Sequence, residues 1–209
     1  MYGACDAVFK TGIHVGVDIS ASQLREDHDA IVLCGGATVR RGLPIPGADL
    51  KGVVQAMDFL PQNNRKVDGI PYEGEELTAK GKKVIVIGGG DTGSDCIGTS
   101  IRHGAVSVTN FEIMPKSTPE RPEGQPWPFW PMRLRTSTSH KEGADRVFSI
   151  STKKFIGDKN GNLKGLVTSE VVWEKMPGKR PVLKEVEGTE KEWECNLALL
   201  ALGFTGSET

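Results

Sequence analysis

An apolar strand-like run, a glycine-rich turn and a helix-like segment follow one another within residues 82–104, and this order most constrains the fold. The run Val84–Ile87 contains only β-branched apolar residues, as is typical of a strand buried on both faces. The turn reads GGGDTG, and Ile97 and Ile101 after it share one face of a helix. Gly104 is placed to end that helix. The sequence therefore predicts the beginning of a βαβ unit.

The glycines of the turn have the spacing Gly-x-Gly-x-x-Gly, which predicts a dinucleotide-binding site. Gly88 would allow the tight turn out of the strand, and Gly90 would let the backbone approach a pyrophosphate. Gly93 would let the helix pack closely on the sheet. The helix N-terminus then offers free N–H groups and a partial positive charge to the phosphates. An ordinary glycine turn is the alternative, and the strands on either side of the unit favour the cofactor site.

A second strand is expected at Val106–Ile113, and it ends near Glu112. The distance 112 − 93 = 19 residues from Gly93 is the spacing expected for an acid that binds a ribose. No arginine follows this strand directly, so the sequence predicts NADH, and less readily NADPH, as the cofactor. Asp91 would either contact the cofactor or stabilise the helix N-terminus. The other residues of the turn complete the predicted pyrophosphate site: Gly89, Asp91 and Thr92.

Composition excludes several other classes of function. The chain has 209 residues, of which 37% are hydrophobic and 25% charged, with a formal net charge of −1. This balance argues against nucleic acid or a membrane surface as partner, and no apolar run is long enough to span a bilayer. The beginning is unlike a signal peptide, so we expect a cytoplasmic protein. The cysteines and histidines lack ligand-like spacing, which predicts no metal site, and no catalytic side-chain set stands out.

The N-terminal part is expected to contain short elements. Val15–Ile19 alternates weakly, as a strand would, and Ser20 is placed to cap a short helix. Ala30–Leu33 has the composition of a buried strand. It runs into Gly35 and Gly36, a glycine pair that would either bring the backbone close to a ligand or form a plain turn.

A helix and a crossing segment are expected next. Val53, Met57 and Leu60 mark one face of a helix that Pro61 is expected to end. The segment Gln62–Lys80 is polar and rich in turn residues, which favours a connection between two domains.

The segment Pro115–Pro131 holds six of the chain's 12 prolines. It also contains Trp127, Phe129 and Trp130, and such dense aromatic residues argue against disorder. Two interpretations stay open: a loop that covers part of the core, or a lid or subunit contact. His140, shortly after this loop, is a further candidate to face a ligand.

The C-terminal part changes to strands divided by turns, which predicts an antiparallel meander. The expected strands are Val147–Phe155, Leu166–Trp173 and Val182–Val186. The turns lie at Gly157–Gly161 and Pro177–Gly178, and Leu197–Leu202 is a last buried strand that ends at Gly203. The fold class is therefore α/β, with a Rossmann-like parallel sheet and an antiparallel β-meander.

Five stretches together resemble the small (beta) subunit of glutamate synthase. They are VIVIGGGDTGSDC, LPIPGADL, AMDFLPQNN, the PWPxWP loop and the closing LLALGF. The resemblance implies a flavoprotein with two dinucleotide folds, in which a nicotinamide domain is inserted into an FAD domain. Residues 1–64 would then be part of the FAD domain, with Gly35 and Gly36 near the flavin nucleotide. Residues 65–81 would be the crossing linker, 82–204 the NAD(P)H domain, with Gly203 a further cofactor contact, and 205–209 the return to the FAD domain.

The resemblance also implies an activity. In this family NAD(P)H reduces FAD, and electrons pass through iron–sulfur clusters to a large subunit that makes glutamate from 2-oxoglutarate and glutamine-derived ammonia. The family's cysteine clusters and first FAD motif lie upstream of these residues. We therefore expect an internal piece that binds FAD poorly alone, with iron–sulfur clusters only outside this chain. Two alternatives stay open: another flavin reductase of the same fold, or a non-catalytic dinucleotide-binding module.

Overall fold

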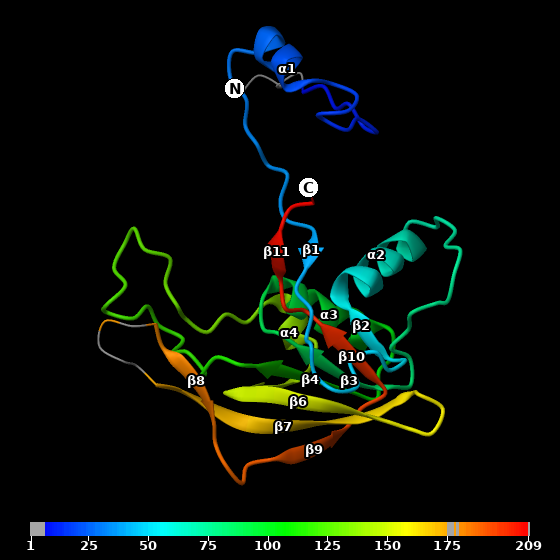
Figure 1. Cartoon of the computed structure of the whole chain (residues 1–209), viewed down its shortest axis with the longest axis vertical. Coiled ribbons are helices and arrows are strands. Elements are labelled where there is room, and N and C mark those ends of the chain that lie inside the picture. Colours follow the sequence, from blue (N-terminus) through cyan, green and yellow to red (C-terminus); the bar gives the residue numbers. More distant parts are fainter. Residues whose placement is uncertain (1–6, 175–177, 179, 209) are drawn as a thin grey trace.

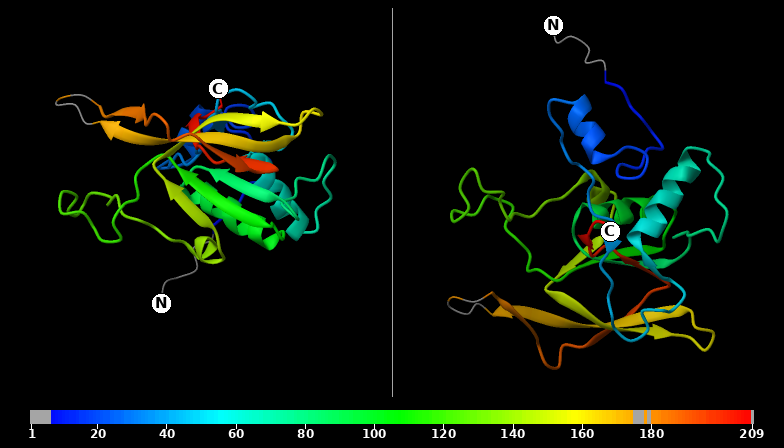
Figure 2. Two further views of the ribbon diagram at one scale, coloured as in Figure 1. Left: turned by 90° about the horizontal axis from the view of Figure 1, so that it is seen from below. Right: turned by 45° about the horizontal axis from the view of Figure 1, so that its top comes forward.

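A computed structural model describes residues 7–174, 178 and 180–208. Its body has three layers (Figures 1 and 2). A five-stranded parallel sheet lies in the middle, with helices on one face and a four-stranded antiparallel sheet on the other. The predicted α/β class, with a parallel sheet and an antiparallel meander, is confirmed.

The parallel sheet contains the predicted βαβ unit at its centre. Its strands in spatial order are β2 (Val53–Gln55), β10 (Leu197–Leu200), β3 (Lys83–Ile87), β4 (Ser107–Glu112) and β5 (Asp145–Phe148). Helix α3 (Asp91–Arg102) connects β3 to β4, and Gly104 with φ +82° follows its end. Central β3 is buried on both faces, as its apolar composition predicted.

Two apolar cores lie on the two faces of the parallel sheet. Alternate residues of β3 supply both, because successive side chains of a strand point to opposite faces. Val84 and Val86 pack with α3 and with α2 (Ala56–Val67), whose Phe59 is fully buried. Ile85 and Ile87 pack against the antiparallel sheet. The parallel sheet is therefore covered on both sides, as such sheets require.

The antiparallel sheet is built around one long strand, β7 (Leu163–Glu174). Strand β6 (Ile150–Gly157) pairs with one edge of β7. The other edge carries β8 (Val182–Glu185) and β9 (Lys191–Glu194), and β9 had not been expected. Of the turn expected at Pro177–Gly178, Pro177 lies outside the described residues.

The strand expected at Val147–Phe155 is in fact two strands that belong to different sheets. Strand β5 ends the parallel sheet, and β6 begins the antiparallel one. Between them Ser149 has φ +55°, a conformation that residues other than glycine rarely adopt. Its N–H donates to Met114 O and its carbonyl accepts from Val171 N, so the segment after β4 and strand β7 both hold it. The alternation of side chains in the sequence continues from β5 into β6, so the sequence pattern gives no sign of the break at Ser149.

The helix expected to end at Pro61 continues through it to Val67. Proline removes one N–H from the helix, and here the packing of Ala56, Phe59 and Gln62 against the sheet outweighs that loss. Val53 belongs to strand β2, and Met57 is exposed, so the predicted helix face was wrong. Strand β2 and helix α2 share the core of the parallel sheet, so no break in packing marks the expected domain boundary at residue 64.

The N-terminal segment lies apart from the layers (Figure 1). Helix α1 (Ala21–Asp27) has the expected cap, because the Gln23 N–H donates to Ser20 Oγ at 3.1 Å. The strand expected at Ala30–Leu33 is absent, and Leu33 is 90% exposed. An isolated bridge joins Val15 to Ile19 where a strand had been suggested. The backbone of Ala30–Leu33 has no sheet partner among the described residues, and a strand forms only by pairing.

Strand β1 (Val39–Arg40) pairs antiparallel with β11 (Phe204–Gly206), which joins the segment after α1 to the C-terminal end of the described chain. The proline-rich loop between β4 and the short helix α4 (Thr138–Lys141) extends outward (Figure 1). Trp127 is 84% exposed and Trp130 is 77% exposed, so the loop does not cover the core with these side chains. None of the described helices is both long and apolar enough to cross a bilayer.

We predict that Phe59→Ala lowers the free energy of unfolding by about 3–5 kcal/mol, because it empties a fully buried site. Trp127→Ala serves as the matched control, since this exposed side chain is expected to leave stability within about 0.5 kcal/mol. Urea unfolding of both variants measures the two changes. A loss of stability in Trp127→Ala comparable to that in Phe59→Ala would contradict the exposed placement of the loop.

Candidate dinucleotide-binding site

The tight turn predicted at Gly88 is present at the C-terminal end of β3. Gly88 has φ +118°, and a Cβ built there would lie 2.2 Å from the carbonyl oxygen of Ala201. Its N–H donates to Phe111 O at 2.9 Å, which holds the turn against β4. A side chain at this position would therefore suffer both backbone strain and a clash.

The other two motif glycines have different surroundings. A Cβ on Gly93 would lie 2.3 Å from Gly88 O, so α3 approaches β3 as closely as the motif predicted. A Cβ on Gly90 would meet nothing within 4 Å. Gly90, with φ −80°, therefore faces open space in front of the helix N-terminus, where a phosphate could approach.

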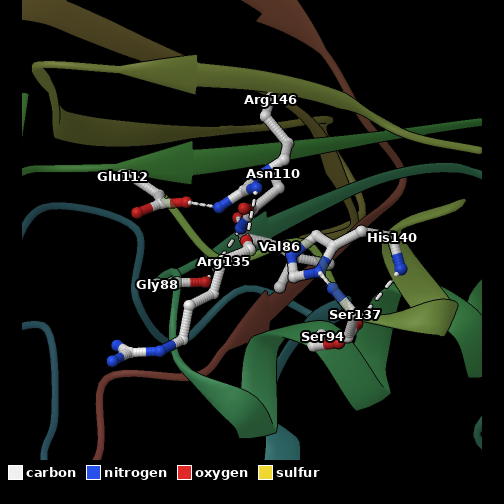
Figure 3. A network of polar contacts seen from close by, with 9 residues as sticks. All are labelled: Val86, Gly88, Ser94, Asn110, Glu112, Arg135, Ser137, His140 and Arg146. Carbon is white, nitrogen blue, oxygen red and sulfur yellow. Dashed lines mark hydrogen bonds and ion pairs between the residues drawn. The ribbon is translucent and has the colours of Figure 1, made fainter. Parts of the chain in front are cut away.

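A buried amide supports the turn from β4. Asn110 is fully buried, and its Nδ2 donates to Val86 O at 3.1 Å and to Gly88 O at 2.8 Å (Figure 3). The sequence analysis missed this residue. The signal that could have found it was a single amide in a segment predicted to be a buried strand, because a buried polar group needs a hydrogen-bond partner.

Glu112 lies at the end of β4 with its side chain against the turn. A Cβ on Gly89 would be 2.1 Å from Glu112 Cδ, so the carboxylate covers that glycine. Glu112 Oε1 accepts from Arg146 Nη2 at 2.5 Å, and the two side chains are only 16% and 15% exposed (Figure 3). Arg146 Nη1 donates to Arg135 O at 3.0 Å. Arg146 was not predicted, and it joins the acid to the end of the proline-rich loop.

Two adjoining cavities lie on either side of the turn and share Gly89, Gly90, Glu112 and Met114. The smaller cavity, of about 300 Å³, faces Leu43 and Leu202 and is mostly apolar. The larger, of about 430 Å³, extends from the N-terminus of α3 to the proline-rich loop. Its walls include the cationic side chains Arg133, Arg135 and Arg146, and also the His140 imidazole. A further cavity of about 690 Å³ lies between β2 and α2, away from the motif.

His140 enters the larger cavity from α4. The Ser137 N–H donates to its Nδ1 at 3.2 Å, and Ser137 Oγ also contacts Ser94 Oγ of α3 (Figure 3). Burial lowers the pKa of the His140 imidazole, the charge of Arg146 lowers it further, and Glu112 acts in the opposite direction. The ring is therefore neutral near pH 7 with its proton on Nε2. That Nε2 is buried and has no hydrogen-bond partner among the described residues.

The remaining predicted site residues are only partly brought together. Asp91 is the first residue of α3 and lines the larger cavity, whereas Thr92 beside it lines neither. Gly203, with φ +77°, joins β10 to β11, and neither cavity includes it. Gly35 and Gly36 lie in the exposed N-terminal segment, away from the turn. Within residues 7–174, 178 and 180–208, no three His, Cys, Asp or Glu side chains gather to hold a metal ion.

Curated relatives match nearly the whole chain. It is 50% identical over 204 residues to a glutamate synthase [NADPH] small chain of Mycobacterium tuberculosis, covering 96% of this chain and 41% of that protein. This chain is homologous to part of the glutamate synthase small chain. The Bacillus subtilis small chain is 42% identical over 96% of this chain and 42% of its own length. Glutamate synthase [NADH] of Schizosaccharomyces pombe is 45% identical over 95% of this chain and 10% of its length. The resemblance drawn from the five stretches is thus confirmed.

The chain spans about two fifths of the length of the small chains that it matches. A scan against models of protein families found no match. Among solved structures, the oxidoreductase FprA of Mycobacterium tuberculosis has a TM-score of 0.61 at 17% identity, covering 94% of this chain and 55% of FprA. The FprA complex with NADPH has a TM-score of 0.60 at 16% identity. These likenesses show a shared fold.

We predict that Gly93→Ala destabilises the chain by at least about 2 kcal/mol, because its methyl group would overlap the Gly88 carbonyl. Gly90→Ala is the matched control. Alanine fits the backbone at Gly90 and meets no atom, so the loss is expected to stay below about 1 kcal/mol. Thermal unfolding measures both changes, and equal losses would show that the helix does not approach the strand this closely.

Proposed function

We propose that this chain binds a reduced pyridine nucleotide and positions it to pass a hydride to FAD, as the NAD(P)H-binding part of a glutamate synthase small chain. The observation that carries the proposal is the turn from Gly88 to Gly93. It opens in front of a helix N-terminus, with Gly90 uncovered and Glu112 at the end of the next strand. Free N–H groups and the helix dipole favour phosphate at such a place.

The two cavities suggest how the cofactor extends from the turn. We place the pyrophosphate at the uncovered Gly90, where the cavities meet in front of α3, and the adenosine ribose at Glu112. The adenosine half then lies in the larger, cationic cavity. The nicotinamide half lies in the smaller, apolar one beside Leu43 and Leu202.

Hydride transfer to a flavin depends on positioning, and no side-chain acid or base is required. When bound, FAD supplies the ring that accepts the hydride. Gly35 and Gly36 lie in an exposed segment with no atom near enough to form a cradle, so we derive no flavin contact from them. This chain's contribution is to hold the nicotinamide in a mostly apolar cavity.

We retain the assignment of the N-terminal segment to an FAD domain, and we propose that the nicotinamide domain begins near Leu43 rather than at Lys82. The reason is packing. Strand β2 pairs with β10, and Phe59 of α2 lies in the same core as Val84 and Val86. Residues 65–81 then form a connection within the nicotinamide domain.

We also propose a large glutamate synthase subunit as partner, with glutamine and 2-oxoglutarate as the substrates of the complex. The names of the Mycobacterium tuberculosis and Bacillus subtilis relatives, both small chains, support this proposal. Electrons would leave the flavin through iron–sulfur clusters held outside this chain.

The test of the proposed site is NADH titration of the chain by calorimetry. We predict that Gly90→Ala weakens NADH binding at least about tenfold, equivalent to about 1.4 kcal/mol, because its methyl group occupies the approach of the pyrophosphate. The variant's stability, measured separately, excludes unfolding as the cause. Unchanged NADH affinity in Gly90→Ala would contradict the proposed position of the pyrophosphate.

We propose a preference for NADH over NADPH. The carboxylate of Glu112 can accept both ribose hydroxyls, and it would repel a 2′-phosphate. Both Nη atoms of Arg146 are already engaged, one by Glu112 and one by Arg135 O. Relatives named for NADPH and for NADH are both close to this chain, so their names do not decide the choice.

We predict at least about tenfold tighter binding of NADH than of NADPH, and a smaller difference in Glu112→Ala. Titration of the chain and of the variant with both cofactors measures this. Equal or tighter NADPH binding by the unmodified chain would contradict the preference and would direct attention to Arg133 and Arg135. Unchanged NADH affinity in the variant would show that Glu112 does not hold the ribose.

A further inference from the structure

We propose that Trp130, Arg135 and His140 form the site for the adenine base of the dinucleotide. This inference rests on the proposed function and adds the residues that recognise the base. All three side chains line the larger cavity together with Glu112. The proline-rich loop would then be a wall of the cofactor site, and its exposed Trp130 would have a ligand to cover it.

The first observation is a stacked pair on the loop. The Arg135 guanidinium lies over the Trp130 ring, with Cζ 4.5 Å from the ring centroid. Arg135 Nη2 also donates to Pro131 O at 3.1 Å, which holds the guanidinium in place. Purine bases stack on aromatic rings and on guanidinium planes, and this pair offers both kinds of surface.

The second observation is an unused donor. The Ser137 N–H occupies His140 Nδ1, which leaves the proton of the neutral ring on Nε2. Nε2 is buried without a hydrogen-bond partner among the described residues, and the His140 ring lines the larger cavity. A buried donor without a partner is costly. A shift of the ring into the cavity that it lines would bring this donor to a ring nitrogen of adenine, which is an acceptor.

The third observation is the link to the ribose acid. Arg146 contacts Glu112 through one Nη and the backbone oxygen of Arg135 through the other (Figure 3). The acid and the backbone of Arg135 are therefore held at the two ends of the Arg146 guanidinium. Adenine is covalently joined to the ribose, so a base whose ribose meets Glu112 must lie within this neighbourhood.

The test is titration of the full chain with ADP-ribose, which carries adenine and both phosphates but no nicotinamide. We expect Trp130→Ala to weaken ADP-ribose binding about tenfold, the size of effect found when a stacking aromatic is removed. Trp127→Ala is the matched control, because Trp127 belongs to the same loop, is equally exposed and does not line the cavity. Arg135→Lys keeps the charge but loses the plane, and a similar weakening is expected.

Three outcomes would overturn the inference. If Trp130→Ala bound ADP-ribose within twofold of the unmodified chain, stacking on Trp130 would be excluded. Intact NADH binding in that variant would leave the proposed function unaffected. If Arg135→Lys lowered the affinity for 2′-phospho-ADP-ribose but not for ADP-ribose, Arg135 would be assigned to a phosphate and not to the base. Failure of the unmodified chain to bind either NADH or ADP-ribose would overturn the proposed function as well.

Discussion

The close approach of α3 to β3 is the constraint on which the rest of this structure depends. Gly93 lies directly against the carbonyl of Gly88, and only a residue without a side chain permits this. The contact aims the helix N-terminus at the open space in front of Gly90. Asn110 holds the same turn from the neighbouring strand, so the backbone is fixed from two sides before any ligand is bound. Such preorganisation lowers the ordering cost of binding.

The second sheet determines what surrounds that turn. The chain leaves the parallel sheet at Ser149 and enters the antiparallel one, which covers the face opposite the helices. Strand β6 of this sheet lines the apolar cavity beside the turn, whereas the proline-rich loop, α4 and β5 line the cationic cavity. In the proposed binding mode, the two halves of the dinucleotide would therefore have chemically different surroundings.

Arg146 connects the proposed cofactor site to the proline-rich loop. It lies on β5, far in the sequence from both Glu112 and the motif glycines, and it reaches the acid and the loop backbone together. A partly buried ion pair of this kind is sensitive to the loss of either partner, because the remaining charge would be left without compensation. The position of the loop and the orientation of the acid are therefore coupled.

The sequence by itself determined the βαβ unit, the tight turn at Gly88, the close packing at Gly93, the position of Glu112 at the end of β4 and an antiparallel meander, because short-range patterns dictate each of them. Tertiary structure alone decided the division at Ser149, the continuation of α2 through Pro61 and the absence of a strand at Ala30–Leu33. Each of these depends on a partner distant in the sequence: a second sheet, a core to pack on, or a neighbouring strand. The same holds for Arg146 and Asn110, whose partners become neighbours only when the strands pair.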